Sequence, residues 1–316
     1  MLHMAGKKTK TRDSSRLRDE ASQWFNFQTD SYLERTARPI CSLVFLVPFI
    51  VIYELGTIFC NTDILSQTQE RVVAFVWLQE FLNYLGIAPR FALAAPPLVV
   101  VVILIAWHMT SRKPWHIHLG DLPPMFLESV LLAIPLIVFS LFLNSRTVAP
   151  PTEVSVAIAA SSAASDVDPS RTATPGGGGL SRPAVSQGGY DRRSRLVPDL
   201  ITGIGAGIYE ELVFRLILVC LLMLVFQDIL RLPWKNAIMF SVVVSAVLFS
   251  LHHHIVVVNG RVVFGDVFSM ARFGFRTIAG VYFAGLFAIR GFGITAATHA
   301  CYDIIATILN TFWLGD

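Results

Sequence analysis

Three short motifs in the second half of the chain place ionisable residues inside otherwise apolar segments. An unpaired ionisable group in a membrane helix is energetically expensive, so each of these residues needs a structural or chemical reason to be there. Carboxylates, imidazoles and a guanidinium that converge from three helices can activate water and stabilise an oxyanion, which is the chemistry of amide hydrolysis. The residues are Glu210, Glu211 and Arg215 in the first motif, His252, His253 and His254 in the second, and His299 and Asp303 in the third.

The first motif separates its two glutamates by function. Glu211 and Arg215 are four residues apart, so they can pair on one helical face. Glu210 is turned by about 100° from Glu211 and points elsewhere. One carboxylate is therefore held by the arginine while the other can act on a proton. The alternative is a salt-bridged pair that only joins two helices.

The histidine motifs leave alternatives open. Three consecutive histidines cannot share one helical face, and spacing alone does not decide which of them points inward. A surface metal-binding tract is a rival interpretation of this run. His299 and Asp303 lie at positions i and i+4, so they share a face and can hydrogen-bond. By itself such a pair is equally consistent with a structural role.

A bound divalent metal is the second way in which these groups could work, because histidine and carboxylate ligands suit zinc. The chain contains no HExxH zinc motif and no G-x-S-x-G nucleophile motif. Asp266 follows Gly265 but has no second intramembrane aspartate in a matching context, which argues against an aspartyl protease.

In order and spacing, the three motifs resemble the signature of the CPBP family, the CAAX proteases and bacteriocin-processing enzymes. That signature is EExxxR, then FxxxH, then HxxxN or a close relative. Here EExxxR begins at Glu210, FxxxH is Phe249 with His253, and HxxxN is His299 with Asp303 in place of asparagine. The motif match covers roughly residues 200–305, and the joint occurrence of all three motifs is specific where any single one is weak.

The resemblance implies a role for each site residue. It implies that Glu210 and His253 activate the attacking water, and that His299 and Asp303 stabilise the oxyanion. It also implies that Glu211 and Arg215 support these residues. The catalytic residues expected from the resemblance are Glu210, Glu211, Arg215, His253, His299 and Asp303.

Asp303 departs from the family pattern. An asparagine amide donates a hydrogen bond, whereas an ionised carboxylate only accepts. Asp303 can therefore donate to an oxyanion only when protonated; otherwise it orients His299 or binds a metal. We expect no obligatory cofactor. If a metal such as zinc is present, the expected ligands are Glu210, His253 and His299.

These motifs require membrane helices to position them. Hydrophobic residues make up 54% of the chain and charged residues only 15%, whereas roughly a quarter of a soluble domain is charged. Several apolar runs approach the ~20 residues that a membrane-spanning helix needs. The composition predicts an all-α membrane protein, a polytopic bundle of about eight transmembrane helices. The expected spans are residues 40–60, 71–87, 91–109, 126–144, 200–226, 237–258, 277–289 with an N-terminal extension, and 293–313.

Composition also divides the chain into four parts. Residues 1–39 form a polar, basic segment without the features of a signal peptide, and 40–144 hold the first group of helices. Residues 145–198 are rich in Ala, Ser, Pro and Gly and are expected to be a flexible linker, and 199–316 hold the motifs. Basic residues at the N-terminus and in the linker favour a cytoplasmic side for both, which fits eight spans better than seven. The compact spans favour a bacterial plasma (inner) membrane.

The most consistent function is an intramembrane endopeptidase that acts on membrane-anchored proteins or peptides in the lipid bilayer. The resemblance implies prenylated CAAX-type or bacteriocin-like substrates. A non-catalytic membrane scaffold or immunity protein and a proton-coupled transporter are the alternatives; an inverted repeat would favour the transporter, and we find none. The net charge of +3 gives no reason to invoke a nucleic-acid partner.

Deletion of most of residues 150–190 tests the linker assignment. We expect the shortened protein to insert into membranes as the full chain does, because a tether contributes no packed surface. Membrane fractionation followed by alkaline carbonate extraction measures this. Loss of the shortened protein from the membrane fraction would show that the segment is part of the folded structure.

Overall fold

The computed structural model describes residues 31–59, 78, 80–82, 84, 86, 95–147, 192–258, 261–264 and 268–313. Among these residues, five helices are long and apolar enough to cross a membrane. The expected fold class, a helical membrane bundle, is confirmed. The predicted span 71–87 falls largely outside the described residues, so the total of eight spans stays a prediction, as does the linker, most of which is likewise outside them.

The described residues of the first half include two long apolar helices and one shorter apolar helix. A Pro123-Pro124 pair lies in the first turn of the last of them, where the missing N–H groups have no intrahelical partner to lose. The elements are α2 (Tyr32–Thr36), α3 (Pro39–Phe59), α6 (Ala95–Ser111), the 3₁₀ turn η2 (Leu119–Asp121) and α7 (Leu122–Thr147).

The second half begins with a continuous helical segment that contains two π-helical stretches. π-helical turns are rare and occur often at functional sites. The segment consists of α9 (Arg192–Glu211), η3 (Leu212–Leu218), α10 (Val219–Met223) and η4 (Leu224–Ile229), and α11 (Trp234–His252), β1 (Ile255–Val258), β2 (Arg261–Phe264) and α12 (Met270–Phe312) follow it. Pro233 ends the connection and occupies the N-cap position of α11.

The predicted span 237–258 is too long at its C-terminal end. The helix stops at His252, and Ile255–Val258 pairs antiparallel with Arg261–Phe264. The reason lies in the sequence, because a run of β-branched residues favours a strand and Asn259-Gly260 is a strong two-residue hairpin sequence. Apolarity alone made the segment look like a continuation of the helix.

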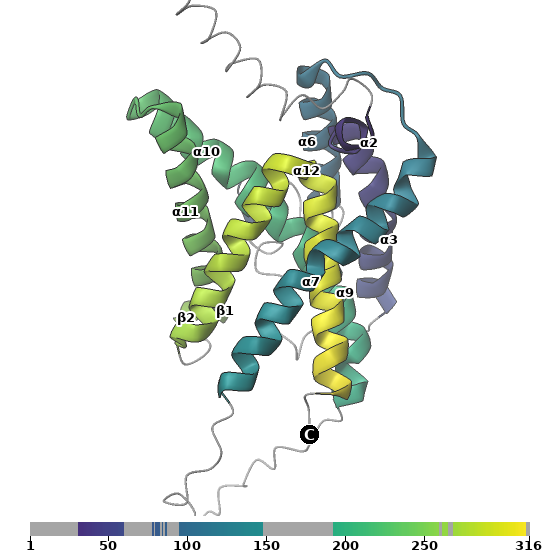
Figure 1. Cartoon of the computed structure of the whole chain (residues 1–316), viewed down its shortest axis with the longest axis vertical. Helices are drawn as coiled ribbons and strands as arrows, with labels where there is room; N and C mark the ends of the chain where they lie inside the picture. The colour runs from purple at the N-terminus through teal and green to yellow at the C-terminus, as the bar shows by residue number, and fades with distance from the viewer. Residues whose placement is uncertain are drawn as a thin grey trace, which may run out of the picture.

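A sharp bend at Gly291 divides α12 into two legs (Figure 1). Gly291 has φ +78°, a conformation that L side chains rarely adopt. This confirms the break predicted at residues 291–293. The leg before the bend packs beside α11 and α7, and the leg after it packs beside α9.

Arg290 fixes the bend from the inside. Its guanidinium donates to both carboxylate oxygens of Glu128 on α7, at 2.5 and 2.6 Å, and to the Thr36 hydroxyl at 3.0 Å. The backbone N–H of Gly293 donates to Ser42 Oγ on α3 at 3.0 Å. The bend is thus tied to three separate elements, which sets the direction of the leg that carries the third motif.

Further ion pairs hold the short helix α2 at this end of the bundle. Arg35 pairs with Asp121 at 2.9 Å, and Glu34 pairs with Arg38 at 2.5 Å and with Lys113 at 2.9 Å. The hydrogen bond from Arg38, supported by Lys113, lowers the pKa of the Glu34 carboxyl to about 2. Glu34 therefore stabilises this end at neutral pH, and its contribution is lost only in strong acid.

Helix α9 lies between α3 and the second leg of α12. The Tyr209 hydroxyl donates to Glu54 Oε1 on α3 at 3.1 Å, so Glu54 faces another helix. On the opposite side, a Cβ added at Gly207 would lie 2.5 Å from the Ala300 backbone nitrogen and 2.7 Å from the Ala296 carbonyl oxygen. The missing side chain lets the two backbones approach closely, one turn from Glu210.

Gly207→Ala tests this close approach. We expect it to destabilise the protein by about 1–3 kcal/mol, because the added methyl group meets backbone atoms that cannot move independently. Thermal unfolding of the purified protein in detergent, followed by tryptophan fluorescence, measures the change.

Gly285→Ala is the matched control. It is also a helical glycine, but its added Cβ would meet nothing within 4 Å. We expect no loss of stability there. Equal melting temperatures for the two variants would contradict the packing described for α9 and α12.

Candidate active site

The deepest part of the site is a chain of three side chains from two helices. Glu211 Oε2 pairs with Arg215 Nε at 3.0 Å, as the i, i+4 spacing predicted. Its other oxygen, Oε1, accepts from His299 Nδ1 at 2.8 Å. Glu211 and Arg215 are almost completely buried, with side-chain exposures of 0% and 1%. Glu211 therefore fixes both the arginine and the imidazole.

Aromatic rings surround the buried guanidinium. The Arg215 guanidinium carbon lies 4.1 Å from the ring centroid of Phe249 and 5.5 Å from that of Phe283. Arg215 Nη2 also donates to the Gly280 carbonyl oxygen at 3.4 Å. A ring face attracts a cation that has lost its water shell, so these contacts offset part of the cost of burying Arg215.

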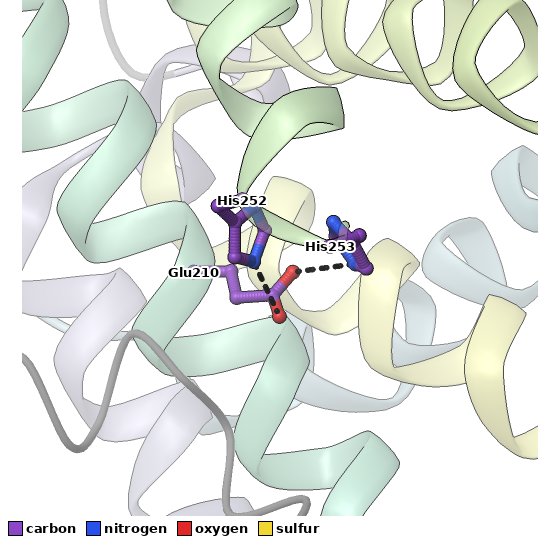
Figure 2. A group of neighbouring side chains, drawn as sticks. All are labelled: Glu210, His252 and His253. Atoms are coloured by element: carbon purple, nitrogen blue, oxygen red, sulfur yellow. Dashed lines mark hydrogen bonds and ion pairs between the residues drawn. The ribbon is translucent and has the colours of Figure 1, made fainter. Parts of the chain in front are cut away.

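Glu210 meets the histidines at the end of α11 (Figure 2). Its Oε1 lies 3.4 Å from His252 Nε2, and its Oε2 lies 3.8 Å from His253 Nε2. His299 Nε2 lies 3.9 Å from Oε2. One carboxylate from α9 thus stands among three imidazoles from two other elements.

The backbone carbonyl of Phe249 determines which ring nitrogens face Glu210. His252 Nδ1 and His253 Nδ1 lie 2.5 and 2.9 Å from this oxygen. A carbonyl oxygen only accepts, so each Nδ1 carries the hydrogen. His252 Nε2 also lies within hydrogen-bonding distance of Glu210 Oε1, at 3.4 Å, and because a carboxylate only accepts, Nε2 is the donor in this bond. Hydrogens on the facing imidazoles, a water molecule or a cation can each compensate the buried carboxylate.

His299 has a different environment. Its ring stacks on Phe283, with centroids 4.5 Å apart and an interplanar angle of 19°. Its Nδ1 donates to Glu211, so Nε2 is directed toward the space between Glu210 and Asp303. The distance from His299 Nε2 to Asp303 Oδ2 is 3.5 Å. The i, i+4 relation of His299 and Asp303 is thus realised as an ion-pair contact.

All six side chains expected from the sequence lie in one cluster, and the structure adds two more. His252 approaches Glu210 more closely than His253 does, whereas His254 packs against Phe268 and Phe273. The run of three histidines was the signal for His252, but its spacing could not show which rings turn inward. No sequence signal pointed to Phe283.

Glu210, His252 and His253 also fit the donor set of a catalytic zinc ion. One ligand atom of each lies within 4.8 Å of the others, and three protein ligands with an open fourth position are typical of such sites. This compact group contains His252 rather than His299, which differs from the ligands expected from the sequence. A metal bound here would supply Lewis-acid activation of water.

An apolar cavity of about 350 Å³ borders the cluster on one side. Its lining is almost entirely aliphatic and aromatic, and His252 is its polar boundary. The lining includes Val213 and Ile217 from η3 and Leu248 and Leu251 from α11. Apolar volume next to the reacting groups can hold a hydrophobic part of a substrate.

A buried carboxylate–histidine cluster in a helical membrane bundle holds the kinds of groups that amide hydrolysis needs. Residues 193–305 match the family model described as "Type II CAAX prenyl endopeptidase Rce1-like". The match over this part of the chain is consistent with a CPBP-family intramembrane protease. No curated protein and no solved structure gives a significant match.

The family domain and the apolar helices together identify an integral membrane protein of the protease type. The domain supports intramembrane endopeptidase activity in general, and the family implies membrane-anchored peptide substrates. The matched range contains all three motifs, which lie on α9 and η3, at the end of α11, and on α12.

A double-mutant cycle tests the buried pair of Glu211 and Arg215. We expect Arg215→Met to destabilise the protein by about 3–5 kcal/mol, because it removes one partner of a desolvated ion pair. The double variant Glu211→Gln/Arg215→Met should recover part of this loss, since it leaves no uncompensated carboxylate. Chemical unfolding in detergent measures all four corners of the cycle.

Arg231→Met, at an exposed arginine in the loop before α11, is the control and should leave stability unchanged. If Glu211→Gln and Arg215→Met changed the free energy of unfolding additively, Glu211 and Arg215 would not stabilise each other.

Proposed function

We propose that the protein is an intramembrane endopeptidase in which Glu210, with His253, activates the attacking water. The observation that carries this proposal is the convergence of the Glu210 carboxylate with the Nε2 atoms of His252 and His253. A water molecule that donates a hydrogen to the Glu210 carboxylate has an oxygen lone pair left for attack. His253 is the half-buried histidine of the pair, with a side-chain exposure of 26% against 3% for His252, so it is more accessible to water.

The reaction follows from these positions. Glu210 accepts a proton as the water oxygen bonds to the scissile carbonyl carbon, which gives a tetrahedral oxyanion. The same proton passes to the leaving amine when the carbon–nitrogen bond breaks. Glu210 ends as it began, and one water molecule has been consumed for each bond cleaved.

His299 is the residue best placed to stabilise the oxyanion. In its imidazolium form it donates from Nδ1 to Glu211 and presents Nε2–H toward the space beside Glu210. Asp303 faces the same Nε2 at 3.5 Å, so it orients the ring without having to donate a hydrogen bond itself. The replacement of asparagine by aspartate is compatible with the reaction in this arrangement. Arg215 acts through Glu211.

The substrate we propose is a membrane-anchored peptide with a bulky hydrophobic group, of the prenylated CAAX type. The apolar cavity beside His252 supports a hydrophobic group at this position. A bacteriocin-like membrane peptide is the other substrate class that the family resemblance suggests. We also propose a bacterial plasma membrane as the location, with the N-terminus in the cytoplasm.

Histidine substitutions in reconstituted protein test these roles. The substrate is a fluorogenic peptide that ends in S-farnesylated Cys-Val-Ile-Leu, in proteoliposomes. We expect His253→Ala to lower kcat by about 100-fold or more and His252→Ala to lower it less, because His253 faces the water and His252 only positions Glu210.

His254→Ala is the matched control, since this ring packs against Phe268 and Phe273 rather than Glu210. Its activity should stay within about twofold of wild type, as expected for a change outside the reacting groups. Equal losses for all three histidines would contradict the assignment of His253. Full activity of Glu210→Gln in the same assay would refute the mechanism.

A further inference from the structure

Phe283, which lies on the first leg of α12 and outside all three motifs, covers one face of the His299 ring. The two rings are nearly parallel, with centroids 4.5 Å apart and an interplanar angle of 19°. They are far apart along the chain and meet because α12 folds back at Gly291 (Figure 1). Phe283 is almost completely buried, with an exposure of 1%. The contact therefore joins the two legs of α12 within the catalytic cluster.

Neighbouring contacts hold Phe283 in place. It belongs to a small hydrophobic cluster with Leu136 of α7 and Leu286 of its own leg. One residue earlier, the Tyr282 hydroxyl donates to the Leu132 carbonyl oxygen of α7 at 2.7 Å. Side chains in a close-packed interior have little room to move. Phe283 therefore presents a fixed ring face to the second leg.

Phe283 also approaches the other partner of Glu211. The Arg215 guanidinium carbon lies 5.5 Å from the Phe283 ring centroid, and Arg215 Nη2 donates to the carbonyl oxygen of Gly280, about one turn before Phe283, at 3.4 Å. Glu211 binds Arg215 with one oxygen and His299 with the other. The carboxylate, the guanidinium, the phenyl ring and the imidazole thus form a closed circle of contacts.

The hydrogen bond to Glu211 does not by itself fix the direction of His299 Nε2. An imidazole that donates from Nδ1 can still turn about the axis of that hydrogen bond without lengthening it. A stacked aromatic ring fixes the plane of the imidazole as well. With both constraints, Nε2 is held 3.9 Å from Glu210 Oε2. This direction matters because an oxyanion donor must be aimed at the point where negative charge develops.

We propose that Phe283 is a positioning residue of the active site, which holds the His299 ring in the plane that directs Nε2–H toward the oxyanion. The inference rests on the proposed endopeptidase function. Phe283 does not meet the reacting atoms and acts through His299. If Phe283 only filled volume, its replacement would lower stability and leave the turnover of the folded molecules unchanged.

Substitution of the ring tests this role in the proteoliposome assay. Phe283→Leu keeps an apolar side chain but removes the flat face. We expect kcat per folded molecule to fall about 10-fold to 100-fold with little change in KM, because a misdirected oxyanion donor weakens the transition state and leaves substrate binding intact. Phe283→Tyr keeps the ring face and should retain most of the turnover. Phe283→Met, which also lacks a ring face, replaces the leucine variant if that variant does not fold.

A double-mutant cycle separates positioning from packing. In a His299→Ala background, Phe283→Leu should lower single-turnover cleavage no further, because the residue that it positions is absent. Phe45→Leu is the matched control, since Phe45 is also buried but lies on α3, where its ring contacts Phe49. Its turnover per folded molecule should stay within about twofold of wild type.

A spectroscopic measurement does not depend on cleavage. Full-length wild-type protein is labelled with ¹⁵N-histidine in nanodiscs of phosphatidylcholine, and the Nδ1–H resonance of His299 is assigned by its absence from His299→Ala. We expect Phe283→Leu to broaden this resonance, because a ring that turns exchanges its bonded hydrogen with water more readily. Phe45→Leu should leave the width unchanged.

The outcomes that would overturn the proposal are distinct. They are equal losses of kcat for Phe283→Leu and Phe45→Leu, a loss for Phe283→Tyr as large as that for Phe283→Leu, additive effects of Phe283→Leu and His299→Ala, and an unchanged width of the His299 resonance in Phe283→Leu. Absence of cleavage by the wild-type protein would instead refute the proposed function, and the width of the resonance would then decide whether Phe283 holds the His299 ring.

Discussion

The structure depends on the burial of charge inside a membrane helix. Glu210 and Glu211 at the end of α9 and Arg215 on η3 have side-chain exposures of 7%, 0% and 1%. Removing such groups from water is unfavourable unless each finds a partner, and the partners come from other helices. Glu211 recruits His299 from α12, and Glu210 recruits the histidines of α11. The ion pairs that make burial tolerable therefore also assemble the site.

The rest of the bundle sets the distances at which these partners meet. The bend at Gly291, held by Arg290 and Glu128, directs the second leg of α12 along α9. Gly207 lets the two backbones approach closely enough for His299 to reach Glu211. At the end of α11, the Phe249 carbonyl turns two imidazoles so that their Nε2 atoms face Glu210. An apolar cavity borders the cluster beside His252.

Much of this arrangement could be predicted from the sequence, because helical periodicity and the free-energy cost of burying a charge depend on residue type and spacing. The pairing of Glu211 with Arg215, the divergence of Glu210 and the break at residues 291–293 all followed from spacing and residue type. Three-dimensional packing decided the rest. The inward turn of His252 depends on a carbonyl three residues earlier, and the stacking of Phe283 on His299 joins the two legs of α12. The end of α11 was misplaced because apolarity does not distinguish a helix from a β-branched strand.

The central claim is that Glu210 makes this bundle a protease, and the most direct test is a comparison of protein termini in cells. Membrane proteins from cells that carry the wild type or Glu210→Gln are compared by mass spectrometry of their N- and C-termini, with equal expression of both forms verified. The account predicts a set of cleaved termini that is present with the wild type and absent with the variant, which would also identify the substrates. Identical termini in both samples would contradict it and favour a scaffold or transporter that uses the same buried charges.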